Sequence, residues 1–161
     1  KPHACCIVPE KRQEITTEGG LDVAAEHRHL APFVNTLNKN GSRVSLFIDP
    51  DPVQIAVSKA LGAAVVELHT GSYCDAFLNG QEELVHHELS RLQEASQVAH
   101  AAGLEVHAGH GLTFETVQPI ARIPEIKELN IGHFLIGEAI FTGLEDAIKK
   151  MRRLMDEARA S

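Results

Sequence analysis

The chain contains 161 residues, of which 43% are hydrophobic and 23% are charged, and its formal net charge is −7 at pH 7. This length suits one domain with a sizeable core, and this composition argues against a disordered chain. The negative charge argues against non-specific binding to nucleic acid, although a local basic pocket could still receive an anionic metabolite.

No segment predicts a membrane span or an export signal. No run approaches the roughly twenty apolar residues that cross a bilayer, and the opening KPHACCIVPEK lacks the pattern of a secretory leader. The three cysteines, Cys5, Cys6 and Cys74, have no C-x-x-C spacing and cannot all pair within the chain. We therefore expect a cytoplasmic protein with reduced thiols that does not bind a membrane or nucleic acid.

Strand-like and helix-like segments alternate from the start of the chain. The apolar run 3–8 predicts a first strand, and apolar residues at near-helical spacing predict a helix within 19–41. Pro32 predicts that this helix bends or starts late. Residues 43–48 predict a second strand, and Asp51 predicts the N-cap of the helix that follows.

The same alternation continues through the middle of the chain. Residues 63–71 predict a third strand, followed by a loop that contains Tyr73. A long amphipathic helix is expected over about 79–102, and residues 104–109 predict a fourth strand.

The last third predicts one more strand between helices. Thr113 can cap a helix that ends near Ile123, and residues 127–132 predict a fifth strand. The segment 133–141 resembles a short extra helix, and a closing amphipathic helix begins near Leu144.

Five strand-then-helix units in series predict parallel strands joined by right-handed crossovers. A doubly wound sheet and part of a (β/α)8 barrel both fit this order. Polar Glu67 and His69, like Glu105 and His107, alternate with apolar residues, which favours a barrel with a shared polar interior. Because five units are three fewer than eight, we expect residues 1–161 to form one barrel domain without its N-terminal strands.

His110 is the best candidate for a general acid or base. It follows the predicted strand 104–109 directly and lies between Gly109 and Gly111, so its imidazole can project while the glycine amides approach a ligand closely. The alternative is a histidine that only caps a turn.

Gly132 and His133 lie at the end of the fifth predicted strand, a placement that matches that of His110. Free backbone N–H groups at the start of a helix bind phosphate, and barrels often bind phosphate at this place. Anion binding is therefore expected, and simple packing at a tight turn is the alternative.

Two further features carry candidate functions. Glu67 lies on a strand between apolar neighbours, so it predicts an electrostatic or acid–base group, or an ion pair with a cation on a neighbouring strand. The polar segment 9–20, PEKRQEITTEGG, predicts a lid over the site, and a merely solvated loop is the alternative.

One competing set of residues fits a mononuclear metal site of a barrel hydrolase: Glu67, His69, His107, His110 and His133. The first predicted strand offers no H-x-H pair, and no carboxylate ends the last predicted strand. Metal chemistry is therefore the weaker interpretation.

Several long motifs occur in one order: VPEKRQEITTEGGLDV, RVSLFIDPD, ELHTGSYCDA, AGHGLT and ELNIGHFLIGEAIF. Together they resemble the pyridoxine 5'-phosphate synthase family of vitamin B6 biosynthesis over nearly the whole chain. The resemblance implies a (β/α)8 barrel, assembled into a homo-octamer, with no organic cofactor and no metal. It implies a transferase that condenses 1-deoxy-D-xylulose 5-phosphate with 3-amino-2-oxopropyl phosphate to give pyridoxine 5'-phosphate, phosphate and water.

The resemblance also assigns roles to single residues. His110 matches the acid–base histidine, Glu67 the carboxylate that stabilises the transition state, and Thr16 a contact to the deoxyxylulose phosphate. The segment 9–20 matches the loop that closes over the substrates. Three residues match contacts to the phosphate of the aminoketone: Gly111, Gly132 and His133.

The family's first three strands, which carry another catalytic histidine and a catalytic glutamate, have no counterpart in this sequence. We therefore expect the 161-residue chain to be inactive by itself. A non-catalytic module that binds phosphorylated metabolites through the remaining loops is the other alternative.

Overall fold

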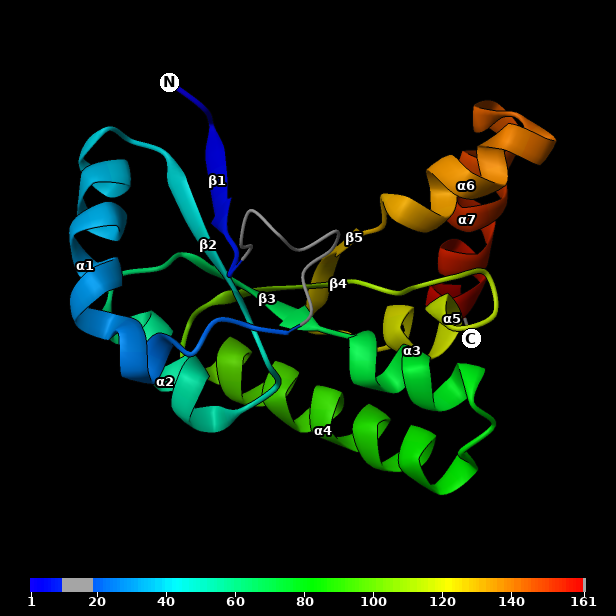
Figure 1. Ribbon diagram of the computed structural model, residues 1–161, viewed down its shortest axis with the longest axis horizontal. Coiled ribbons are helices and arrows are strands. Elements are labelled where there is room, and N and C mark those ends of the chain that lie inside the picture. Colours follow the sequence, from blue (N-terminus) through cyan, green and yellow to red (C-terminus); the bar gives the residue numbers. More distant parts are fainter. Residues whose placement is uncertain (10–18, 161) are drawn as a thin grey trace.

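The computed structural model describes residues 1–9 and 19–160, which form an α/β fold around one parallel sheet (Figure 1). Within these residues the strands are β1 (Ala4–Ile7), β2 (Arg43–Ile48), β3 (Val65–His69), β4 (Glu105–Gly109) and β5 (Ile126–Asn130). Their order in the sheet is the order in the chain, with β1 and β5 as the edge strands.

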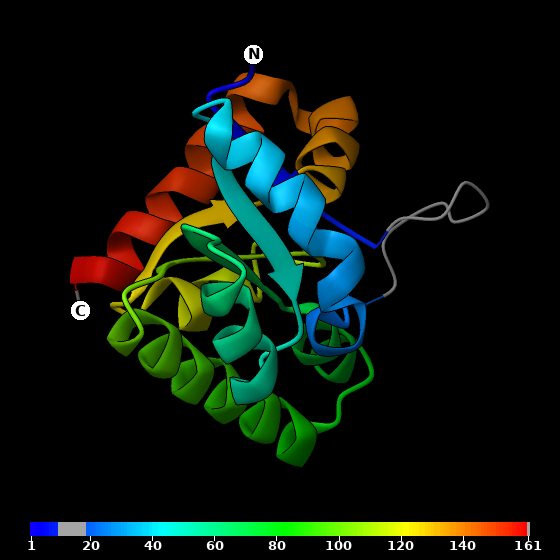
Figure 2. The same ribbon diagram turned by 90° about the vertical axis from the view of Figure 1, so that its left-hand side faces the viewer.

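The helices of the described residues are α1 (Val23–Lys39), α2 (Pro52–Ala60), α3 (Gly71–Leu78), α4 (Glu82–Ala101), α5 (Val117–Ala121), α6 (His133–Thr142) and α7 (Leu144–Ala160). Helices α1, α2, α4 and α5 wrap the outer side of the curved sheet (Figures 1 and 2). Right-handed crossovers between neighbouring parallel strands produce this one-sided arrangement. It matches a barrel-type fold rather than a doubly wound sheet, whose helices cover both faces.

The alternation predicted for the strands is confirmed. Val66 and Leu68 are fully buried in the core between sheet and helices, whereas Glu67 and His69 lie on the opposite face. His107 on β4 is the in-register neighbour of Glu67 and lies on the same face. The face away from the helices is therefore polar, and it carries the candidate site.

Helix starts follow the predicted capping chemistry. The Asp51 carboxylate accepts hydrogen bonds from the backbone N–H groups of Val53 (2.7 Å) and Gln54 (3.1 Å) at the start of α2. The Asp22 carboxylate likewise caps α1. Each cap satisfies amide groups that have no partner within the helix.

Pro32 does not delay α1, so the predicted late start is wrong. The helix runs from Val23 to Lys39 with Pro32 inside it. The Pro32 ring is exposed, and the Thr36 hydroxyl donates a 2.7 Å hydrogen bond to the Pro32 carbonyl. Because proline has no N–H, the carbonyl one turn before it loses its helical hydrogen bond. At an exposed position water can bind that carbonyl, which lowers the free-energy cost of a proline inside the helix.

Two helices differ from the prediction. The segment after β3 is helix α3 rather than a loop, because Tyr73, Cys74 and Ala76 on its inner face are buried. Helix α5 spans only Val117–Ala121, since the Thr113 hydroxyl accepts the Glu115 N–H and caps a turn before the helix.

Helix α6 differs from its neighbours because none of its residues is buried, although its sequence, HFLIGEAIFT, is mostly apolar. Ile140 and Phe141 are 79% and 86% exposed. No helix in residues 1–9 and 19–160 is long and apolar enough to cross a membrane.

Candidate active site

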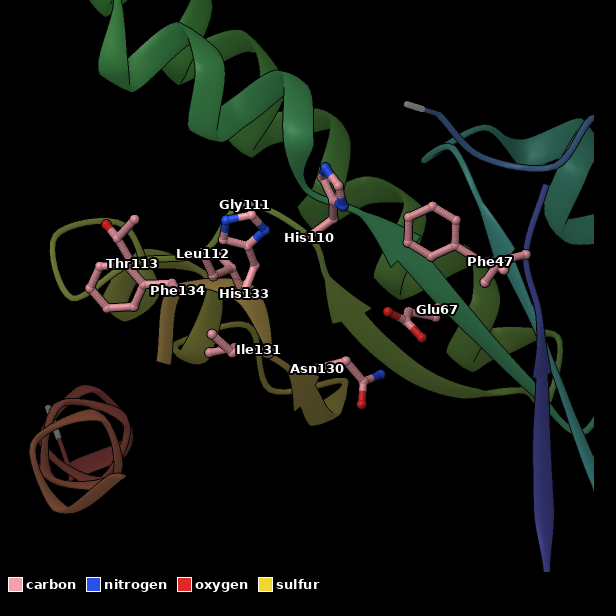
Figure 3. A pocket seen from close by; sticks show the side chains of 12 residues that line it. Phe47, Glu67, His110, Gly111, Leu112, Thr113, Asn130, Ile131, His133 and Phe134 are labelled. Atoms are coloured by element: carbon pink, nitrogen blue, oxygen red, sulfur yellow. The ribbon is translucent and has the colours of Figure 1, made fainter. Parts of the chain in front are cut away.

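A cavity of about 560 Å³ opens where the strands end at their carboxyl termini (Figure 3). The residues that line it come from β2, β3 and β5, from the segments that follow β1, β4 and β5, and from the start of α6: Val8, Phe47, Glu67, His110, Gly111, Leu112, Thr113, Asn130, Ile131, Gly132, His133 and Phe134. This is the end of a parallel α/β sheet at which ligands bind.

Most of the predicted site residues meet in this cavity: Glu67, His110, Gly111, Gly132 and His133. Thr16 lies outside the described residues, as does most of the predicted lid. These five cavity residues come from segments up to 66 positions apart (Glu67 to His133), and only the sheet topology brings them together. Their location is therefore settled, whereas their chemical roles stay predictions.

The backbone at the end of β4 turns sharply to present His110. His110 has a φ of 82° and is the non-glycine residue with positive φ among those described; Gly111 follows with a φ of 79°. A left-handed conformation costs a residue with a side chain about 1–3 kcal/mol. Thr70 stabilises the turn, because its buried hydroxyl contacts the carbonyl oxygens of Gly109 (2.7 Å) and His110 (2.5 Å).

The imidazole of His110 is held mainly in its neutral form. Partial burial lowers the pKa of His110 below 6.5, and the neighbouring His69 and His133 lower it further, while Asp75 acts in the opposite direction. A neutral imidazole at pH 7 has a free lone pair and can accept a proton from a substrate.

Glu67 is the other ionisable group in the floor of the cavity, and only 9% of it is exposed. Burial raises the pKa of this carboxyl, whereas the Cys6 thiol, His107 and Asn130 favour the carboxylate. The Cys6 thiol donates to Glu67 Oε2 at 3.5 Å. The predicted alternative, an ion pair with a cation on a neighbouring strand, does not occur within residues 1–9 and 19–160.

Gly109 makes room for the Glu67 carboxylate. A Cβ atom at position 109 would lie 2.5 Å from Glu67 Oε1 and 2.8 Å from the Asn130 carbonyl oxygen. Both distances are too short for any side chain. The sequence indicates Gly109 only as a neighbour of His110, because no local pattern reveals this contact across strands.

The start of α6 forms the opposite wall of the cavity. Gly132 is the N-cap of α6 and supplies no side chain, and the first helical bond runs from the Ile136 N–H to the Gly132 carbonyl. The amides of residues 133–135 therefore have no partner within the helix. Unpartnered amides and the positive end of the helix dipole favour an anion at this wall.

The side chains suggested for a metal site do not gather around one point. His107 is bound by Glu105, at 2.7 Å from Nε2, and Glu105 is paired with Arg43, so this histidine is directed toward the amino ends of the strands. Among the residues that the structure describes, no three His, Cys, Asp or Glu side chains are close enough to hold a metal ion together. The geometry does not support the metal-dependent hydrolase.

Comparison with known proteins agrees with the site. The family model described as "Pyridoxal phosphate biosynthesis protein PdxJ" matches residues 1–157. Pyridoxine 5'-phosphate synthase of Ruegeria pomeroyi is 62% identical over 160 residues, which are 99% of this chain and 64% of that protein. The enzymes of that name from Roseobacter denitrificans and Rhodospirillum rubrum are 61% and 59% identical over 99% and 98% of the chain. The chain spans 64% and 62% of those two relatives, respectively.

Proposed function

The chain belongs to the family of the pyridoxal phosphate biosynthesis protein PdxJ. From this membership we propose that it functions as part of a pyridoxine 5'-phosphate synthase. The reaction would condense 1-deoxy-D-xylulose 5-phosphate with 3-amino-2-oxopropyl phosphate to form pyridoxine 5'-phosphate, phosphate and water. One observation carries the proposal: a neutral histidine, a buried carboxyl and an uncapped helix N-terminus line the same cavity.

The wall formed by the end of β5 and the start of α6 would bind a substrate. The free amides at the start of α6, with Gly132 and His133, would hold the phosphate of the aminoketone. Gly111, in the loop after β4, would approach the same substrate through its backbone. Binding energy from a remote phosphate can position the reacting amine and carbonyl, and thereby raise the rate of condensation.

Proton transfer falls to His110. Imine formation, loss of water and ring closure each require a proton to be added or removed. Because its pKa is lowered, His110 is mainly neutral at pH 7, so its lone pair is available to accept a proton, and the imidazolium that forms gives the proton back readily. Glu67 would stabilise positive charge that develops on the condensing amine, and its burial strengthens that interaction.

The closed barrel and its assembly also remain proposals. A (β/α)8 barrel needs three strands in addition to β1–β5, and the open edges of β1 and β5 would pair with them. The exposed apolar surface of α6 favours contact with another subunit, in line with a homo-octamer. A cytoplasmic location stays a prediction.

The direct test is an assay with both phosphates that follows pyridoxine 5'-phosphate by its fluorescence. Two samples are compared: the 161-residue chain alone, and the complete protein as it occurs in the cell. We expect product only from the second sample, with the mass of each verified by mass spectrometry. Product from the 161-residue chain would contradict the need for further strands.

Two other outcomes would replace the proposed function. If the complete protein binds both phosphates with micromolar affinity but forms no product, it is a binding module. If turnover is abolished by a chelator and restored by a divalent metal, the chemistry is that of a metalloenzyme. Light scattering of the same sample measures whether it is an octamer.

A further inference from the structure

His69 is a second histidine beside His110, and a carboxylate fixes its ring. It ends β3, is 8% exposed, and its Nδ1 lies 3.2 Å from Asp49 Oδ1. The hydrogen bond from His69 is the main reason that the pKa of Asp49 is lowered, so Asp49 remains a carboxylate at neutral pH. Because a carboxylate only accepts, His69 donates from Nδ1.

The remaining nitrogen of His69 has no partner of its own. Nε2 is buried and forms no hydrogen bond within residues 1–9 and 19–160. The ring lies 5.0 Å from the ring of His110, centroid to centroid, and both pack edge-on against Phe47. A buried polar atom without a partner is unusual in a structural histidine, and it points toward a role in the site.

Gly71 allows the two imidazoles to approach each other. A Cβ atom at this position would lie 2.5 Å from His69 Nε2 and 3.2 Å from His110 Cδ2. Glycine is therefore required where β3 meets α3, because any side chain would separate the rings.

Asp49 is also held by the segment that directly precedes α1. The Gly20 N–H donates a 3.1 Å hydrogen bond to the same Oδ1 that binds His69. A Cβ atom at Gly20 would lie 2.1 Å from the Asp49 nitrogen, so the two backbones are in direct contact. Both donors hold one carboxylate oxygen in place, which limits the rotation of Asp49.

From this geometry we infer that the Asp49–His69 pair is a positioning element for His110, and that it sets the orientation from which His110 exchanges protons with the substrate. This inference rests on the proposed function. Asp49 fixes the ring of His69, and that ring and Phe47 together limit the rotation of His110. His69 is buried, whereas the Asp49 side chain is 54% exposed, so Asp49 holds the buried ring from the edge of the site. A histidine whose ring is fixed by a carboxylate can in turn orient the catalytic group beside it.

Electrostatics adds a second effect with a defined sign. His110 is faced by His69 from β3, by Asp75 from α3 and by His133 from α6. His69 is in turn faced by Asp49, on which Arg91 also acts. Because His69 lowers the pKa of His110, its removal should raise that pKa and reduce the fraction of neutral base near pH 6.5.

The test uses the complete enzyme and three variants, His69→Gln, Asp49→Asn and the double variant. We expect each single change to lower kcat roughly ten- to hundred-fold, because a small displacement of a catalytic group has effects of this size. KM should change less than about two-fold, since neither residue holds a phosphate. The acidic limb of the kcat/KM profile should move to higher pH in His69→Gln.

The double variant separates one unit from two independent residues. If Asp49 acts through His69, the double variant should be no slower than His69→Gln alone. The matched control is His86→Gln, the same substitution at an exposed position on α4. It should leave kcat, KM and the pH profile unchanged.

Thermal unfolding of each variant shows whether the fold is retained. Two results would overturn the inference: a kcat within two-fold of the wild type in His69→Gln, or losses in the single variants that multiply in the double variant. A wild-type enzyme that forms no product would instead refute the proposed function.

Discussion

The Thr70 hydroxyl contacts the carbonyl oxygen of His110, and this bond joins the residue after β3 to the residue after β4. Thr70 is fully buried, so water does not compete for its hydroxyl. It therefore stabilises the left-handed turn at His110 from the neighbouring strand. The direction of the candidate catalytic base thus depends on a residue that lies outside the cavity lining.

Replacing Thr70 with valine should both destabilise the fold and lower the rate. The change removes the hydroxyl from both carbonyl oxygens; Gly109 keeps the Thr70 N–H as a donor, whereas the His110 carbonyl loses its hydroxyl partner, and an unsatisfied buried group costs about 1–3 kcal/mol. Urea unfolding should show a loss of this size, and kcat should fall because the turn can relax. Thr70→Ser retains the hydroxyl and should recover most of both; equal losses in the two variants would contradict this role.

Replacing His110 with asparagine separates its chemistry from its backbone. Asparagine tolerates positive φ better than other residues with side chains, so the turn at φ 82° should persist. We expect kcat to fall roughly 10²- to 10⁴-fold, the usual contribution of a general acid or base, with the melting temperature nearly unchanged. His110→Ala should be equally slow but less stable. An Asn variant with more than a tenth of wild-type kcat would rule out His110 as the proton carrier.

The sequence predicted those parts of the site that depend on local pattern. Alternation along 63–71 placed Glu67 on the polar face, because side chains of a strand alternate strictly. Placement of His110 and Gly132 directly after strands was enough to predict that they meet, since parallel strands end at one edge of the sheet.

Other parts depend on contacts between distant segments, which no spacing rule reveals. Asp49 directly follows β2 and His69 ends β3, 20 residues later, and only the register of β2 with β3 makes them partners. The role of Gly109 likewise requires the positions of both β3 and β5. Helix α3 was predicted as a loop because its sequence is short and begins with glycine and serine. The burial of Tyr73 against the rest of the fold, which favours the helix, depends on tertiary contacts.

Replacing Gly109 with alanine should abolish activity through Glu67. The new methyl group would lie 2.5 Å from the Glu67 carboxylate and 2.8 Å from backbone, so the strand or the carboxylate must move. Overpacking of this kind costs typically about 1–3 kcal/mol. Both kcat and the urea midpoint should therefore fall. Gly137→Ala is the matched control, because a Cβ atom there meets nothing within 4 Å. A Gly109→Ala variant with the kcat and urea midpoint of the wild type would contradict the assignment.

Replacing Glu67 with glutamine should make the protein more stable at pH 8 and nearly inactive. The pKa of Glu67 is raised by burial, so the folded state binds this proton more tightly than the unfolded state. Between the unfolded value near 4.5 and the higher folded value, the free energy of unfolding falls as pH rises. Each unit of difference corresponds to about 1.4 kcal/mol. Glutamine carries no charge, so Glu67→Gln removes this decrease in the free energy of unfolding.

Urea unfolding at pH 4.5 and pH 8 measures the effect. The stabilisation of Glu67→Gln over the wild type should be clear at pH 8 and small at pH 4.5, whereas Glu94→Gln, at an exposed position, should show neither. A kcat lower by roughly 10²- to 10³-fold is expected if the carboxylate stabilises charge in the transition state. A glutamine variant that is less stable than the wild type at pH 8 would mean that the contacts of Glu67 with the Cys6 thiol and Asn130 outweigh its burial.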